Sequence, residues 1–180
     1  MTHTRRGKTN FGWTYHVTSE VNRRAFELAP QADKELFLAV IAEAKNKKQF
    51  KFELWNFCIM ANHFHFLITP HDGQSLSVII KWIKMVFAIR WNKAHNQTGH
   101  FWGDRFYSRV ISDERDFWSV YDYIDRNPVA AGLVASPEEW CYGGAYHREQ
   151  SITVIVTPVS AVIVEVLMRG GRYRSDLYAL

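Results

Sequence analysis

The feature that most constrains the fold of this 180-residue chain is a pair of strand-like segments separated by a very short turn. Residues 50–60, FKFELWNFCIM, and 64–70, FHFLITP, are rich in aromatic and β-branched side chains, and the residues between them allow only a tight turn. The second segment ends at Pro70 and the HDG turn. These residues therefore predict an antiparallel β-hairpin inside a larger sheet.

Strand-like and helix-like patterns alternate on both sides of this hairpin. Strands are predicted over 13–21 and at the end of 99–112, and amphipathic helices are predicted over 30–47, 75–95 and 113–127. The helix over 113–127 should stop before Pro128, and a turn with a short helix should follow it. The resulting βαββαβα order is that of an α+β protein with two split βαβ units. We predict a ferredoxin-like or RRM-like antiparallel sheet with its helices on one face.

The helix over 75–95, with Ser75 as its N-cap, has two apolar stripes instead of one. Its main stripe consists of Leu76, Ile79, Ile80, Ile83 and Phe87, and its second stripe consists of Val78, Trp82, Met85 and Ile89. A helix of this kind is expected to be covered on two sides. The sheet would cover one side, and the C-terminal tail or another subunit would cover the other.

The chain divides into a domain over residues 1–150 and a tail over 151–180. The start of the tail, SITVIVTPVSAVIVEVLM, contains Pro158 and Glu165, so it predicts a β-hairpin with a basic end and not a membrane helix. Cys58 and Cys141 have no pairing or metal-binding spacing, and the N-terminus lacks an apolar signal region. A cytoplasmic, nucleoid-associated protein without a membrane partner is expected.

Charge is segregated along the chain. Residues 1–51 contain ten Lys and Arg against five Asp and Glu, whereas residues 113–139 contain seven acids against two Arg, and the formal net charge is +4. This distribution is typical of a protein with a polyanionic partner such as a nucleic acid. Charged faces that only maintain solubility give the same pattern.

Two histidines one residue apart, His63 and His65, lie in the second strand of the hairpin. Side chains at i and i+2 of a strand share a face, so the two imidazoles should lie side by side. Phe64, Phe66 and Ile68 would then enter the core from the other face. Two imidazoles are too few for a closed structural metal site, but they suit an open site that binds phosphate through a divalent ion. A chance HxH pair without a metal is the alternative.

A further ligand and a nucleophile are expected on a helix facing these histidines. Tyr123 and Asn127 lie one turn apart in YDYIDRN, so they share a helix face, and a phenol can attack phosphorus. Tyr121 falls on the apolar stripe of this helix and is interpreted as a core residue. Tyr107 remains a competing nucleophile.

Taken in order, MANHFHFLI, GHFWGDRFYSRVI, YIDRNPVAAGLV and PEEWCYGGAYH resemble the single-tyrosine HUH transposases, and in particular the REP-associated tyrosine transposases. The resemblance covers about Trp13 to His147. It implies that His63, His65 and Asn127 hold Mg²⁺ or Mn²⁺ and that Tyr123 attacks DNA. Ala130 replaces a basic residue that the family often has, and Asp125 and Arg126 replace residues that are often apolar.

The resemblance implies a substrate of single-stranded DNA beside an imperfect palindrome that folds as a hairpin. Cleavage would form a 5′-phosphotyrosine and a free 3′-hydroxyl for strand transfer. The candidate DNA-binding side chains are basic residues and one aromatic residue: Arg5, Arg6, Lys8, Arg23, Arg24, Lys81, Lys84, Arg105, Arg109 and Trp102.

Several alternatives stay open at the level of sequence. A non-catalytic module that binds single-stranded DNA or RNA would have a similar sheet, but the aromatic RNP signature is absent. A replication initiator or relaxase of the HUH class is a second alternative. A structural metal-binding protein is a third, which leaves the charge segregation unexplained. The chain could act as a monomer or as a homodimer.

Overall fold

The computed structural model describes residues 13–160 and Val164. In chain order its elements are β1 (Tyr15–Glu20), the 3₁₀ turn η1 (Asn22–Arg24), α1 (Gln31–Asn46), β2 (Phe52–Ile59), β3 (His63–Pro70), α2 (Leu76–Ala94), β4 (Tyr107–Val110), α3 (Glu114–Ala130), the 3₁₀ turn η2 (Pro137–Glu139) and α4 (Gly144–Glu149). The predicted βαββαβα order is present, and η2 and α4 follow it. Ser75 caps α2 as predicted, because its side chain accepts a hydrogen bond from the backbone N–H of Val78.

The four strands form one sheet in the order β2-β3-β1-β4, and every neighbouring pair is antiparallel. Strand β3 therefore lies between β1 and β2, which α1 connects, and β1 lies between β3 and β4, which α2 connects. These are the two split βαβ units that the sequence predicts. Because β1 and β3 are central, they present their outward side chains in the middle of a sheet face.

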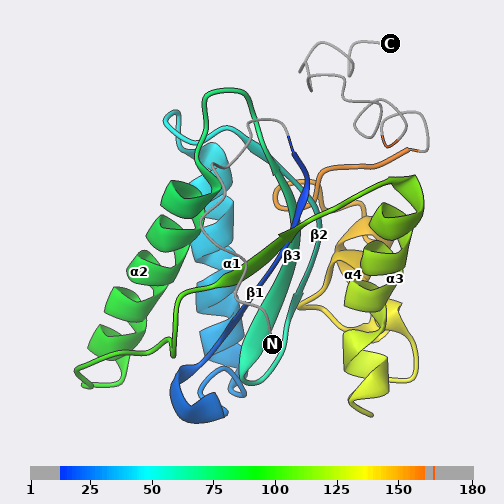
Figure 1. The fold of residues 1–180 in the computed structure, drawn as a ribbon. Coiled ribbons are helices and arrows are strands. Elements are labelled where there is room, and N and C mark those ends of the chain that lie inside the picture. The colour runs from blue at the N-terminus through cyan, green and yellow to red at the C-terminus, as the bar shows by residue number, and fades with distance from the viewer. Residues whose placement is uncertain (1–12, 161–163, 165–180) are drawn as a thin grey trace.

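Helices cover both faces of this sheet, which corrects the prediction that they lie on one face. Figure 1 shows α1 and α2 on one side of the sheet and α3 and α4 on the other. The first layer packs on Phe64, Phe66 and Ile68 of β3, whereas α3 packs on Trp55, Cys58 and Leu67. Strands β2 and β3 are buried on both faces because their outward side chains are also largely apolar.

Helix α3 extends past Pro128 to Ala130, so the prediction that it stops before the proline is wrong. Pro128 lies in the last turn, where its ring costs one backbone hydrogen bond and no following turn is disrupted. The residue next to it still supports the helix end, since the Asn127 carbonyl accepts from the Ala131 N–H at 3.0 Å.

The hairpin predicted in the tail is not formed over the described residues 151–160, which are turns and irregular backbone. Thr157 instead fastens this segment to β2. Its N–H donates to the Leu54 carbonyl at 2.8 Å, and its hydroxyl donates to Glu53 Oε2 at 2.5 Å. The remainder of the predicted hairpin and the basic end lie outside the described residues, apart from Val164.

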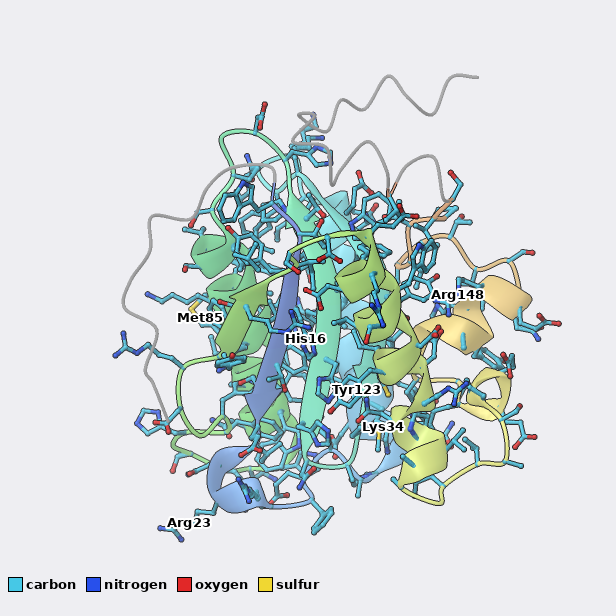
Figure 2. The ribbon with its side chains drawn as sticks, turned by 45° about the vertical axis from the view of Figure 1, so that its right-hand side comes forward. His16, Arg23, Lys34, Met85, Tyr123 and Arg148 are labelled. Atoms are coloured by element: carbon cyan, nitrogen blue, oxygen red, sulfur yellow. The ribbon has the colours of Figure 1, made fainter. Side chains whose placement is uncertain are left out.

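The two apolar stripes of α2 have different surroundings. The main stripe is buried against α1 and the sheet, as predicted, whereas Val78, Met85 and Ile89 of the second stripe are exposed in the described part of the chain. Met85 accordingly lies on the outer side of α2 in Figure 2. No helix of the described residues has the length and apolarity that a bilayer crossing requires.

Candidate active site

The register of the central strands collects polar side chains on the face that α3 covers. Thr18 of β1 lies opposite His65 of β3, Glu20 lies opposite His63, and His16 lies opposite Leu67. Directly opposite residues of antiparallel strands share a face. His16, His63 and His65 therefore lie together in the middle of the sheet, beneath the C-terminal half of α3.

Four rings form the centre of this cluster. His63 and His65 have ring centroids 5.0 Å apart and nearly perpendicular planes, as expected for i and i+2 on one strand. The Tyr123 ring is 5.4 Å from the His65 ring and 6.0 Å from the His16 ring. Figure 2 shows His16 and Tyr123 on elements that face each other. The phenol predicted to be the nucleophile thus lies beside the predicted metal-binding pair.

Burial keeps the imidazoles of this cluster neutral. It lowers the pKa of His65 to about 3, with smaller contributions from His63 and His16, and it lowers the pKa of His63. The pKa of His16 is lowered to about 4 by burial and by the nearby Arg109 guanidinium. Neutral imidazoles have the lone pairs that metal ligation requires.

One buried nitrogen in this cluster has no hydrogen-bond partner among the described residues. It is Nε2 of the buried His65, whose Nδ1 lies 3.1 Å from His16 Nε2. An unpaired polar atom at such a position is costly unless a ligand satisfies it. Two neutral imidazoles suit a divalent cation with open positions, although the described residues contain no group of three His, Cys, Asp or Glu side chains arranged to hold a metal.

Asn127 and Tyr123 lie one turn apart on α3, as predicted. The Asn127 amide Nδ2 donates to the Tyr123 backbone carbonyl at 2.7 Å, which leaves the amide oxygen as an acceptor. Tyr123 is 52% exposed, so a substrate can reach its hydroxyl. Tyr121 is buried against Phe117, as predicted for a core residue.

Tyr107 lies on the same face of the sheet as the histidines. It is opposite Thr18 on β4, and Thr18 is opposite His65, so two strand spacings separate Tyr107 from His65. That separation is about 10 Å. The geometry favours Tyr123 over Tyr107 as the residue that shares a substrate with the histidine pair.

A buried polar network holds α3 in place behind the site. Asp125, two residues after Tyr123, binds Arg148 of α4 at 2.5 Å and accepts from Asn56 Nδ2 of β2 at 2.9 Å. The absence of a side chain at Gly144 lets α4 lie this close to the Asn56 side chain, because a Cβ there would lie 2.0 Å from Asn56 Oδ1. The polar residue at 125, where the family resemblance suggests an apolar one, therefore joins α3 to both β2 and α4.

The predicted DNA-binding residues fall into four groups, the last of which is buried. Arg5, Arg6 and Lys8 lie outside the described residues. Arg23, Lys81 and Arg105 are exposed without a side-chain ion pair in the described part, whereas Arg24 pairs with Glu20 at 3.1 Å and Arg109 pairs with Asp116 at 2.7 Å.

Two predicted DNA contacts are buried in the structure. The Lys84 ammonium donates to Ser19 Oγ at 2.7 Å and to the Asp104 carbonyl at 2.9 Å, and burial lowers its pKa to about 8. Trp102 is 7% exposed and packs against Phe37 and Phe87, while its indole N–H donates to the Lys84 carbonyl. Both residues stabilise the loop between α2 and β4, so stacking of DNA bases on Trp102 is not supported.

Two hollows lie along this loop. One, of about 570 Å³, has a lining that includes Thr18, Glu20, Arg23, Arg24, Arg105 and Tyr107. The other, of about 590 Å³, lies between α2 and the loop and includes Lys81, Met85, Arg105 and Phe106. Asp104 and Arg105 belong to both. Exposed cations therefore line both hollows, and the first includes Thr18, which lies opposite His65.

Sequence reasoning missed His16 and Asn62, both of which contact the histidine pair. His63 Nδ1 lies 2.7 Å from Asn62 Oδ1, and His65 Nδ1 lies 3.1 Å from His16 Nε2. His16 is 49 residues before His65 in the chain, so only the pairing of β1 with β3 brings it to the site. Its place in an alternating strand, between inward Tyr15 and Val17, was the available indication that it shares a face with other polar groups.

Comparison with known proteins places this chain in a family. Residues 9–127 match the family model described as "Transposase IS200 like". A protein of Haemophilus influenzae assigned to the REP-associated tyrosine transposases is 27% identical over 112 residues, which is 57% of this chain and 63% of that protein. The REP-associated tyrosine transposase of Escherichia coli is 25% identical over 144 residues, which is 77% of this chain and 79% of the relative.

A solved structure has the same fold. The structure of a REP-associated tyrosine transposase bound to a REP hairpin superposes with a TM-score of 0.68 and 24% identity, covering 89% of this chain and 96% of that one. The chain spans somewhat less than two thirds of the Haemophilus relative, so whole-protein properties are not transferred from it. Because the family model covers most of the sequence, this chain belongs to the IS200-like transposase family.

Proposed function

We propose that this protein cleaves and rejoins single-stranded DNA next to a hairpin-forming palindrome, with Tyr123 as the covalent nucleophile and with Mg²⁺ or Mn²⁺ as cofactor. The observation that carries the proposal is the position of the Tyr123 ring, 5.4 Å from a buried His65 whose Nε2 has no hydrogen-bond partner among the described residues. Membership in the IS200-like family supports it. The hairpin-bound relative supports the choice of substrate.

The residues that would hold the cation are His63 and His65, through their Nε2 atoms, and Asn127, through its amide oxygen. When bound, a divalent cation supplies Lewis-acid chemistry, since it withdraws charge from a phosphate oxygen and favours the phenolate form of a nearby tyrosine. The protein's own contribution is to keep both imidazoles neutral through burial. It also keeps the Tyr123 hydroxyl accessible on a helix that Asp125 fastens to β2.

In the cleavage step the Tyr123 oxygen forms a bond to the scissile phosphorus while the bond from phosphorus to the 3′-oxygen breaks. The phenol loses its proton and the leaving 3′-oxygen gains one, so the products are a 5′-phosphotyrosine and a 3′-hydroxyl. Tyrosine has a reference pKa of about 10, so deprotonation needs assistance at neutral pH. Because the phosphotyrosine conserves the phosphodiester energy, attack by another 3′-hydroxyl can rejoin the strands without ATP.

The exposed cations beside the site suit the phosphates of the strand. Arg23 and Arg105 line the hollow that includes Thr18, and Lys81 lines the second hollow. We propose that the single strand passes along these two hollows. Binding should therefore weaken steeply with salt, because each phosphate contact releases counterions.

The direct test is to incubate the protein with hairpin-containing single-stranded DNA and Mn²⁺ and to resolve the products on a denaturing gel. A covalent protein–DNA adduct and a free 3′-hydroxyl product are expected, and EDTA should suppress both. Because the target sequence matters, a pool of randomised sequences flanking varied hairpins is the appropriate substrate. Tight binding to such DNA without any adduct would instead support the non-catalytic binding module.

A further inference from the structure

His16 contacts the histidine pair in a way that the cleavage chemistry does not by itself require. Its Nε2 lies 3.1 Å from His65 Nδ1, and the two rings are stacked with centroids 5.3 Å apart and planes 24° apart. The contact crosses from β1 to β3 on the face that α3 covers. It joins a residue outside the HxH motif to the more buried of the two predicted ligands.

A hydrogen bond between two neutral imidazoles needs one donor nitrogen and one acceptor nitrogen. If His65 Nδ1 were the acceptor, its proton would lie on Nε2, which would then be a buried N–H without a partner in the part of the chain that the structure describes. An orphan donor of this kind destabilises the fold, because the N–H loses its hydrogen bond to water and gains none in return. If His65 Nδ1 is the donor, Nε2 instead has a free lone pair, which a bound cation would satisfy.

The neighbouring ligand has the same arrangement. His63 Nδ1 lies 2.7 Å from the Asn62 side-chain oxygen, which can only accept, so the His63 proton lies on Nδ1. Both imidazoles of the pair are then Nδ1–H tautomers with unprotonated Nε2 atoms. Neutral imidazole in water favours the opposite tautomer, so the protein has to impose this one.

We propose that His16 is a positioning residue, which accepts the Nδ1–H of His65 and so fixes the tautomer and ring orientation in which Nε2 can bind the metal. Asn62 has the same role toward His63. Partners that hold the second ring nitrogen of a metal-bound histidine typically contribute ten- to hundredfold to metal affinity. The inference rests on the proposed metal site but concerns a residue that does not itself touch the metal or the substrate.

The test compares His16→Ala with His16→Gln, whose side-chain oxygen can still accept a hydrogen bond. Long-range ¹H–¹⁵N correlation spectra of the metal-free, ¹⁵N-histidine-labelled protein report the tautomer of His65. We expect Nδ1–H in the wild type and in His16→Gln, and a shift toward Nε2–H in His16→Ala. Thr18→Ala is the matched control, because Thr18 lies directly opposite His65 on the same face of β1 and makes no side-chain hydrogen bond in the described structure.

Mn²⁺ affinity, measured from the EPR signal of the free ion without DNA, gives a second readout. His16→Ala should weaken binding ten- to hundredfold, and His16→Gln should stay within a few-fold of the wild type. An Nε2–H tautomer in the wild type would overturn the proposal, as would unchanged affinity in His16→Ala. Equal losses in both variants with the tautomer retained would instead identify His16 as a direct ligand.

Both measurements are made without DNA, so they are independent of adduct formation. If the tautomer and affinity results hold but no adduct forms, the positioning role stands and the proposed strand transfer fails. If an adduct forms but the tautomer does not depend on residue 16, the strand transfer stands and the positioning role of His16 fails. His16→Gln preserves size and polarity, so it keeps the proposal testable if the alanine variant does not fold.

Discussion

The rings of His65 on β3 and Tyr123 on α3 lie 5.4 Å apart and nearly perpendicular, although distant parts of the chain supply them. The contact exists because α3 packs on the sheet face opposite to α1 and α2. Any chemistry that combines the phenol with the histidine pair depends on that layer.

Tyr123→Phe should abolish the covalent DNA adduct, because it removes the attacking oxygen and keeps the ring that packs against His65. Denaturing gel electrophoresis with Mn²⁺ and hairpin DNA measures this. Tyr107→Phe is the control, since Tyr107 is also exposed and lies on the same sheet face. Loss of the adduct in Tyr107→Phe with retention in Tyr123→Phe would mean that the nucleophile is misassigned.

Mn²⁺ should stabilise the wild-type protein against heat through the histidine pair. At a metal concentration one hundred times its dissociation constant, the gain is about 2.7 kcal/mol, or about 5–10 °C in Tm for a chain of this size. Differential scanning fluorimetry should show this shift in the wild type and not in His65→Ala. The exposed His100 provides a control, His100→Ala, which should keep the full shift.

Arg105→Ala should lower both the affinity for single-stranded DNA and its dependence on salt. If Arg105 neutralises one phosphate, the slope of log K against log salt should decrease by about 0.7. Lys84→Met should leave the slope unchanged, because the Lys84 ammonium is already bound to Ser19 and Asp104. Fluorescence anisotropy over a salt series measures the slope for both variants. A smaller slope in Lys84→Met would contradict the buried role of this lysine.

Asp125→Ala should destabilise the protein by about 3 kcal/mol, because it leaves the partly buried Arg148 guanidinium without its carboxylate. Adduct formation should also slow at temperatures where the variant is folded, since α3 loses its attachment to β2 and α4. Urea denaturation of Asp125→Ala, Arg148→Ala and the double variant measures the coupling, expected at about 1–3 kcal/mol. Strict additivity of the two single variants would show that the contact contributes nothing.

The stability of the protein should fall with acid partly through Asp116. Hydrogen bonds from Arg109 lower the pKa of this carboxyl to about 2, below its ordinary value. The unfolded chain therefore takes up the proton first, so this contribution is complete above about pH 4 and is lost as the pH falls toward 2.

Asp116→Asn should accordingly cost about 1 kcal/mol near pH 7 and show a flatter decline of the unfolding free energy between pH 4 and 2. Denaturant titrations at several pH values measure this. The exposed Glu149, which forms no ion pair in the described structure, gives the control Glu149→Gln. An unchanged acid profile in Asp116→Asn would refute the assignment.

Much of this protein follows from local sequence patterns. Alternating apolar residues specify the strands, and the hairpin over 50–70 together with the helical segments specifies the split βαβ order, because short connections leave few ways to pair such strands. The i, i+2 spacing of His63 and His65 and the i, i+4 spacing of Tyr123 and Asn127 likewise fix which side chains share a face. These are properties of neighbouring residues, and the sequence alone determines them.

Only the tertiary structure decided what lies across from those faces. That α3 covers the face opposite to α1, that Lys84 and Trp102 are buried, and that His16 meets His65 all depend on contacts between residues far apart in the chain. No local pattern encodes such contacts, because they result from how whole layers bury their apolar surface. The same reason explains Asp125: it looks exposed in the sequence, yet Asn56 and Arg148 make it part of the support for α3.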